Sequence, residues 1–98
     1  MSDPLTLVVF SRAKPGKEEE LGQRLLALVE PSRAEEGCIS YDMHQSKEDP
    51  AVWMAYENWR SEDDLARHFE QPYLKAFAAL QDELLAEPLD IRKFSLKS

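Results

Sequence analysis

The feature that most constrains the fold is the segment 51–59, which carries apolar side chains at both its even and its odd positions. Successive side chains of a β-strand point to opposite faces of the sheet. Met54 and Tyr56 therefore share one face of the expected strand, and Trp53 and Trp59 share the other. A large apolar surface is rarely left in contact with water, so both faces of this strand need a covering layer.

The order of patterned segments along the chain predicts the fold class. Apolar alternation and helical spacing give these elements: strands over 5–10, 38–45, 51–59 and 89–96, and helices that begin near 17 and 61. We expect Pro31 to bend or end the first helix and Pro72 to interrupt the second. With right-handed crossovers, the order βαββαβ predicts an α+β, ferredoxin-like protein with a four-stranded antiparallel sheet and both helices on one face.

The size of the chain and the apolar second face predict how it assembles. The 98 residues form a single domain, 1–98. Because the helices cover one face only, we expect the open sheet face to be buried in a homodimer, with two sheets packed face to face around a two-fold axis.

Charge and composition exclude several classes of partner. The chain has 12 basic and 19 acidic residues and a net charge of −7, which disfavours nucleic acid and anionic membranes. The start 1–4 has no basic region, and the apolar run 5–10 is too short to span a bilayer. A single cysteine, Cys38, excludes an internal disulfide, and no spacing suggests a metal site. We expect a soluble, cytoplasmic protein with no membrane partner.

One carboxylate and one histidine are candidates for catalysis. Period two places Glu57 on the same face as Trp53, and helical spacing turns His68 toward the sheet with Leu65. If the helices cover the Trp53 face, Glu57 and His68 meet there. The carboxylate would raise the pKa of His68 and burial would lower it, so His68 could act as a base near neutral pH. A buried structural hydrogen bond is the alternative interpretation.

Aromatic residues near this pair are candidates for a substrate pocket. The expected pocket wall consists of Tyr41, Trp53, Trp59, Tyr73 and Phe77. Aromatic residues at such spacings are also typical of an ordinary core. We expect His44 to be exposed and Cys38 to act as a small buried apolar residue rather than a nucleophile.

Four segments resemble the antibiotic biosynthesis monooxygenase family, particularly its small bacterial quinol-monooxygenase-type members. The segments are Lys14-Pro15-Gly16-Lys17, Glu35-Glu36-Gly37-Cys38-Ile39-Ser40-Tyr41, Tyr56-Glu57-Asn58-Trp59 and His68-Phe69. The resemblance extends over nearly the whole chain in order and spacing. It implies a ferredoxin-like monomer in a dimeric α+β barrel, with a pocket between sheet and helices in each subunit.

The resemblance also implies an activity. Several members oxidise quinols or polyketide-like phenols with molecular oxygen and without metal, flavin or haem. By this resemblance His68 would be the base, Glu57 would orient it, and Asn58 or Trp59 would donate hydrogen bonds to developing negative charge. The face assignment, however, turns Asn58 toward the dimer interface. The expected substrate is a small quinol or phenol, and no cofactor is expected.

Related activities remain as alternatives. Haem-degrading relatives use an Asn on the first strand and a Trp and a His on the second helix, whereas the corresponding positions here are Val9, His68 and Ala78. A phospho-sugar isomerase resembles the stretch 57–72, but Arg67 and Lys75 are expected to face outward. The alternatives are therefore a non-catalytic dimeric small-molecule-binding domain and an isomerase of a small carbonyl metabolite.

Overall fold

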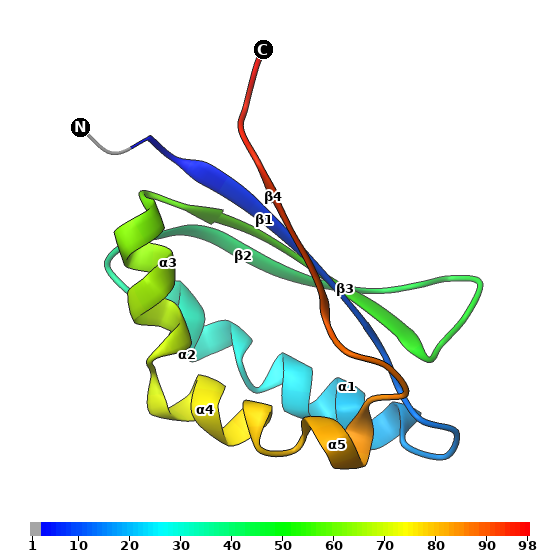
Figure 1. Ribbon diagram of the computed structural model, residues 1–98. Helices are drawn as coiled ribbons and strands as arrows, with labels where there is room; N and C mark the ends of the chain where they lie inside the picture. The colour runs from blue at the N-terminus through cyan, green and yellow to red at the C-terminus, as the bar shows by residue number, and fades with distance from the viewer. Residues whose placement is uncertain (1–2) are drawn as a thin grey trace.

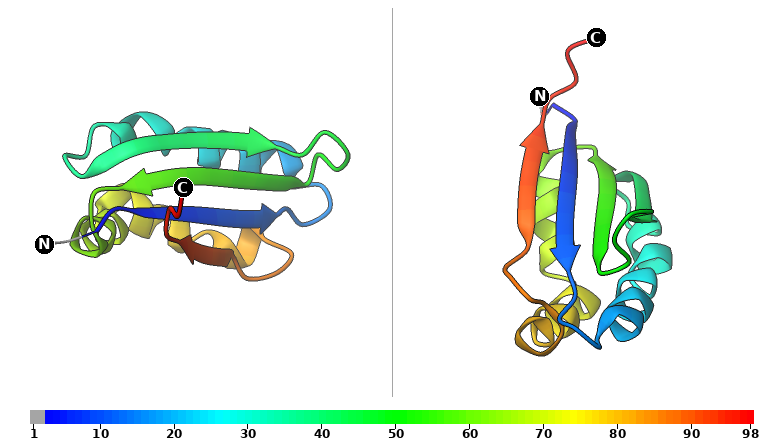
Figure 2. Two further views of the ribbon diagram at one scale, coloured as in Figure 1. Left: turned by 90° about the horizontal axis from the view of Figure 1, so that it is seen from above. Right: turned by 90° about the vertical axis from the view of Figure 1, so that its right-hand side faces the viewer.

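The computed structural model describes residues 3–98 and has a single layer of helices on one face of a sheet (Figures 1 and 2). The strands are β1 (Leu5–Arg12), β2 (Cys38–Gln45), β3 (Val52–Trp59) and β4 (Asp90–Phe94). They lie in the order β2-β3-β1-β4, and each neighbouring pair is antiparallel. This topology confirms the predicted α+β, ferredoxin-like fold.

The expected first helix is divided in two. Helix α1 (Glu18–Leu26) is followed by α2 (Val29–Arg33), and the break lies at Ala27 and Leu28. Pro31 lies inside α2, and a proline ring clashes with the carbonyl four residues earlier, which here belongs to Ala27. The proline therefore bends the helical segment one turn before its own position.

The second helical segment is divided into three parts: α3 (Glu62–Phe69), α4 (Pro72–Ala78) and α5 (Gln81–Leu84). Ser61 caps α3, since its Oγ accepts a 3.1 Å hydrogen bond from the amide of Asp64. Pro72 is the first residue of α4, where its missing amide hydrogen costs nothing. The turn around Glu70 and Gln71 separates α3 from α4, and both belong to the helical layer on one face of the sheet (Figure 1).

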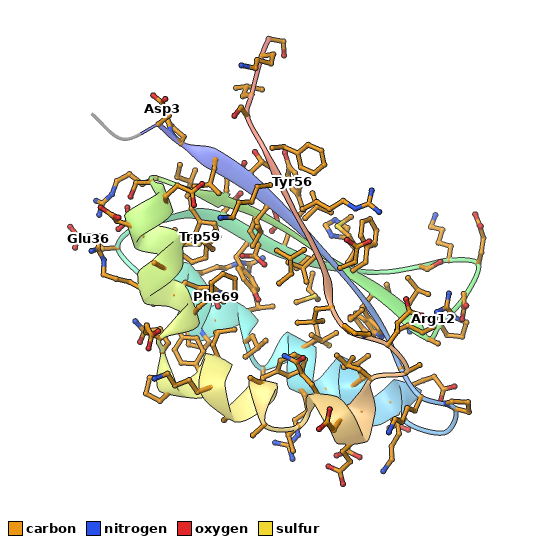
Figure 3. All side chains as sticks on the ribbon, in the orientation of Figure 1. Asp3, Arg12, Glu36, Tyr56, Trp59 and Phe69 are labelled. Atoms are coloured by element: carbon orange, nitrogen blue, oxygen red, sulfur yellow. The ribbon has the colours of Figure 1, made fainter. Side chains whose placement is uncertain are left out.

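The core lies between the sheet and the helices. Trp59, Leu7 and Leu21 are among its largest fully buried side chains. In Figure 3, Trp59 lies on the helix side of the sheet, whereas Tyr56 lies on the opposite side. The helices therefore cover the Trp53 face, which is the condition under which Glu57 and His68 were expected to come together.

The opposite sheet face, called the open face below, keeps apolar side chains exposed. Tyr56 is 42% exposed, Phe10 38% and Phe94 50%. The β1–β4 register pairs Phe94 with Thr6 and Ile91 with Val9, so Phe94 lies on the open face and Ile91 on the helix side. Because these apolar side chains are exposed, the open face remains the predicted dimer interface.

One strand position differs from the expected alternation. Strict alternation over 38–45 would place Ile39 on the same face as Tyr41 and Met43, but Ile39 is 61% exposed. The pairing of β2 with β3 passes from Cys38–Trp59 directly to Ser40–Asn58, so Ile39 is the extra residue of a β-bulge. The bulge shifts the alternation by one residue and places Cys38 and Tyr41 on the same side.

The ends of the chain add little to the sheet. The last strand stops at Phe94 rather than Leu96 because Phe94 already pairs with Thr6, near the beginning of β1. Met1 and Ser2, part of the start expected to lack a membrane signal, lie outside the described residues. Among residues 3–98, no helix has the length and apolar character needed to cross a bilayer.

Candidate functional site

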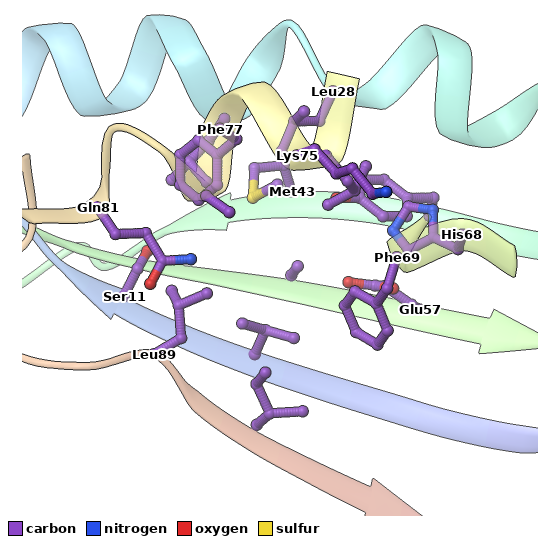
Figure 4. Close-up of a pocket in the computed structure, with 17 residues that line it drawn as sticks. Ser11, Leu28, Met43, Glu57, His68, Phe69, Lys75, Phe77, Gln81 and Leu89 are labelled. Atoms are coloured by element: carbon purple, nitrogen blue, oxygen red, sulfur yellow. The ribbon is translucent and has the colours of Figure 1, made fainter. Parts of the chain in front are cut away.

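A cavity of about 310 Å³ lies between the helix-covered face of the sheet and the helices (Figure 4). Ligand pockets typically span roughly 300–1,000 Å³, so the cavity suits a small molecule. Its wall is mostly apolar and includes Val9, Leu25, Leu28, Tyr41, Met43, Ala55, Phe77, Leu89 and Ile91. Three ionisable side chains other than Tyr41 also line it: Glu57, His68 and Lys75.

Glu57 is a buried carboxyl group on the sheet floor of this cavity. It lies on β3 opposite Leu7 of β1 and is only 3% exposed. Its Oε1 accepts a 2.9 Å hydrogen bond from Nε1 of Trp59, two residues along the same face. Burial raises the pKa of Glu57 to about 7, and the negative charge of Glu35 adds to this, whereas the Trp59 hydrogen bond opposes it. Glu57 can therefore gain or lose a proton near neutral pH.

His68 is the second ionisable group of the cavity and is 1% exposed. Its Nδ1 lies 2.7 Å from Oε2 of Glu35, and the hydroxyl of Tyr73 donates to the same oxygen. The ring packs against Trp59 at 4.4 Å and Tyr41 at 5.7 Å between ring centroids. Burial lowers the pKa of His68, and the Glu35 carboxylate opposes that change. The imidazole is therefore neutral at pH 7.

The partner of His68 differs from the prediction. The expected orienting carboxylate was Glu57, but the hydrogen bond to His68 comes from Glu35, at the turn between α2 and β2. Glu57 is bonded to Trp59 instead. The two predicted residues do share one cavity, each held by its own partner. Sequence reasoning missed Glu35 because the run Glu35-Glu36 looks like a solvated turn, although its side chain is only 13% exposed.

The structure brings two of the six aromatic and amide residues predicted for the substrate pocket to the cavity. Tyr41 and Phe77 line the cavity. The other four do not. Trp53 packs against Gly22 of α1, Trp59 lies beneath His68, and Tyr73 bonds Glu35.

Asn58, which the resemblance implied as a hydrogen-bond donor to the substrate, is the fourth residue outside the cavity. It lies on the open face, where its Oδ1 accepts from the hydroxyl of Thr6 at 2.6 Å and its Nδ2 donates to Ser40 at 2.8 Å. It cannot reach a substrate in this cavity from the far side of the sheet. Asn58 therefore lies on the face that alternation indicated, on the other side of the sheet from the cavity in which the resemblance implied its role.

Two further predictions concern basic residues and the cysteine. Lys75 was expected to face outward; its side chain is 63% exposed and pairs with Glu70 at 2.9 Å, and it also lines the cavity. Arg67 instead bonds Asp64. Cys38 is half-buried, and burial raises its pKa to about 11, so its sulfur is a thiol at neutral pH. In the part of the chain that the structure describes, no group of three or more His, Cys, Asp or Glu side chains is placed to hold a metal ion.

The family model for antibiotic biosynthesis monooxygenases matches residues 4–80. The chain belongs to this family. It is 33% identical over 92 residues to the Bacillus subtilis protein named "Putative monooxygenase YcnE", covering 94% of this chain and 97% of that protein. It is also 33% identical over 94 residues to the uncharacterized Synechocystis protein sll1783. This alignment covers 96% of this chain but only 64% of the Synechocystis protein.

A solved structure shares the fold of this chain. The crystal structure of PA3566 from Pseudomonas aeruginosa superposes with a TM-score of 0.94 at 38% sequence identity. The alignment covers 100% of this chain and 98% of that chain. The fold and the helix-covered sheet described above are thus shared with a relative over the whole domain.

Proposed function

We propose that this chain is a monooxygenase that oxidises a small quinol or phenol with molecular oxygen and without a metal or organic cofactor. The observation that carries the proposal is the state of His68 in an apolar cavity. Glu35 occupies Nδ1 of the imidazole, so Nε2 is the ring nitrogen left for a substrate. A neutral imidazole held in this tautomer is suited to act as a general base.

The proposed chemistry begins with removal of a proton. His68 takes the proton of a phenolic hydroxyl, and the resulting phenolate transfers electrons to oxygen. For a quinol, one oxygen atom replaces a ring hydrogen and the other leaves as water. The products are a hydroxyquinone and water, and the substrate supplies all four electrons. The mostly apolar wall supports this step because it limits side reactions with water.

Glu57 is proposed to act as a hydrogen-bond donor to the substrate, while His68 acts as the base. With its pKa raised to about 7, the carboxyl group can carry a proton at neutral pH. In the protonated form it donates a hydrogen bond, which stabilises negative charge that develops on the substrate oxygen. Trp59 was the earlier candidate for this donor, but its Nε1–H is already bonded to Glu57.

The test is oxygen consumption by metal-stripped protein against a panel of quinols and polyphenols. We expect uptake with at least one substrate, and mass spectrometry with isotopically labelled oxygen gas should find one labelled atom in the product and one in water. Absence of uptake across the panel would contradict the proposal. It would favour a binding domain or a carbonyl isomerase, which thermal-shift screening of metabolites would then separate.

A further inference from the structure

The cavity carries two polar side chains that the proposed chemistry does not use. Ser11 of β1 is 6% exposed, and Gln81, the first residue of α5, is half-buried. Both line the cavity. Within residues 3–98, neither the Ser11 hydroxyl nor the Gln81 carboxamide has a hydrogen bond to another protein group. Neither group is among the buried unpaired atoms of the described residues, so both are accessible from the cavity, where a ligand can replace water as their hydrogen-bond partner.

Ser11 and Gln81 lie at the opposite end of the cavity from Glu57 and His68 (Figure 4). The register establishes this separation. Ser11 pairs with Trp53, which is four residues before Glu57 on β3. At a rise of about 3.3 Å per residue, the backbone positions of the two ends are about 13 Å apart along the strands. Between them the wall is apolar, with Val9 opposite Ala55.

We infer that Ser11 and Gln81 form a second recognition site for a ligand with oxygen atoms at both ends of a flat apolar body. This inference rests on the proposed function only for the role of the Glu57–His68 end. A hydroxyl and a carboxamide can each donate and accept, so together they bind either a hydroxyl or a carbonyl oxygen. Neither is charged, which selects a neutral oxygen rather than a carboxylate or phosphate at this end.

The position of Lys75 agrees with this assignment of polarity. Its ammonium group is paired with Glu70, and in Figure 4 the side chain lies near His68 rather than near Ser11. Among the described residues that line the cavity, Lys75 is the only Lys or Arg, and it lies away from the Ser11–Gln81 end. Ligands with adjacent oxygens would satisfy only one end of the cavity and leave the other unpaired.

Binding measured without oxygen tests the inference. The probes are a naphthalene diol with hydroxyls at its two far ends, the naphthol that lacks the second hydroxyl, and the diol with adjacent hydroxyls. Calorimetry under anaerobic conditions should show that the wild-type protein binds the far-end diol roughly tenfold more tightly than the other two, as expected for one or two added hydrogen bonds.

The variants assign that preference to residues. Ser11→Ala combined with Gln81→Leu should abolish the preference while leaving the affinity for the naphthol unchanged, which also shows that the cavity is intact. Gln81→Leu alone changes a half-buried helix position and should reduce the preference for the far-end diol. This single variant replaces the double variant if the latter does not fold. Gln23→Leu, at an exposed position of α1, is the control and should retain the preference.

Two results would overturn the inference: no preference in the wild-type protein, or a preference that survives Gln81→Leu undiminished. Both differ from a failure of the proposed function. Anaerobic binding needs no turnover, so a protein that discriminates among the diols but consumes no oxygen would retain the recognition site and lose the oxygenase role.

Discussion

At the scale of single residues, Glu57 and His68 line one apolar cavity, and each is hydrogen-bonded to a different partner. Glu57 is held by Trp59, and His68 is held by Glu35. Burial moves their pKa values in opposite directions, raising that of Glu57 and lowering that of His68. Both changes favour neutral forms, so at pH 7 a deprotonated base and a partly protonated acid lie in the same cavity.

The raised pKa of Glu57 makes the protein less stable as pH increases. The folded state holds this proton up to about pH 7, while the unfolded chain loses it near 4.5. Ionising the buried group therefore costs about 3 kcal/mol of unfolding free energy between these two pH values. Glu57→Gln should remove this loss.

Urea denaturation across that pH range measures the effect, with Glu36→Gln as control because Glu36 is exposed. The wild-type protein and the control should both lose stability relative to Glu57→Gln as pH rises. Parallel stability curves for the wild type and Glu57→Gln would contradict the buried, proton-exchanging carboxyl group.

Glu35 is predicted to be a positioning residue that sets the pKa of His68. Its carboxylate raises that pKa against the effect of burial. Replacing it by Gln should therefore move the acidic limb of the kcat/KM profile to lower pH and reduce kcat by about tenfold or more. Tyr73→Phe keeps the carboxylate, so it should move the limb less. An unchanged acidic limb in Glu35→Gln would show that Glu35 is only structural.

At the scale of elements, close packing against α1 fixes one wall of the domain. A Cβ on Gly22 would lie 2.6 Å from Cζ2 of Trp53. Gly→Ala in a helix normally stabilises by about 0.5–1 kcal/mol, but here the added methyl overlaps the indole ring, and overpacking costs about 1–3 kcal/mol. We expect Gly22→Ala to lower the melting temperature.

A double-mutant cycle separates these two effects. Trp53→Phe removes the ring atoms that the new methyl would contact, so in that background Gly22→Ala should be neutral or stabilising. Equal destabilisation in both backgrounds would show that contact with Trp53 is not the cause.

Much of the fold could be predicted from local signals, because those signals act locally. Pro31 and Pro72 divide the helical segments because proline has no amide hydrogen to donate and its rigid ring clashes with the preceding turn. The bulge at Ile39 could not be predicted, since it depends on how β2 pairs with β3. The contact of Glu35 with His68 joins residues 33 positions apart and depends on the path of the turn beneath α3.

The pocket wall shows the same limit. Alternation correctly assigned Trp53, Glu57 and Trp59 to the helix-covered face and Asn58 to the other. It could not tell which residues of the covered face meet helices directly and which face the cavity, because the α3–α5 breaks decide that. The same breaks bring Lys75 and Gln81 to the cavity.

At the scale of the whole molecule, the apolar open face of the sheet predicts a dimer. Its side chains include Val8 paired opposite Tyr56, with Phe10 and Phe94 exposed nearby. We expect a two-fold dimer through this face. Val8→Lys combined with Tyr56→Lys should give a monomer in sedimentation velocity at micromolar concentration. Leu26→Lys, which replaces a 54% exposed apolar residue on the helix layer, is the control. A wild-type monomer would contradict the prediction.

The central claim is that His68 is the base of a cofactor-free oxygenation, and oxygen uptake by matched histidine variants tests it most directly. His68→Gln removes the base, whereas His44→Gln changes an exposed histidine on β2. With the best quinol of the panel and metal-stripped protein, we predict that His68→Gln loses nearly all uptake while His44→Gln matches the wild type. Wild-type rates in a folded His68→Gln protein would contradict the account.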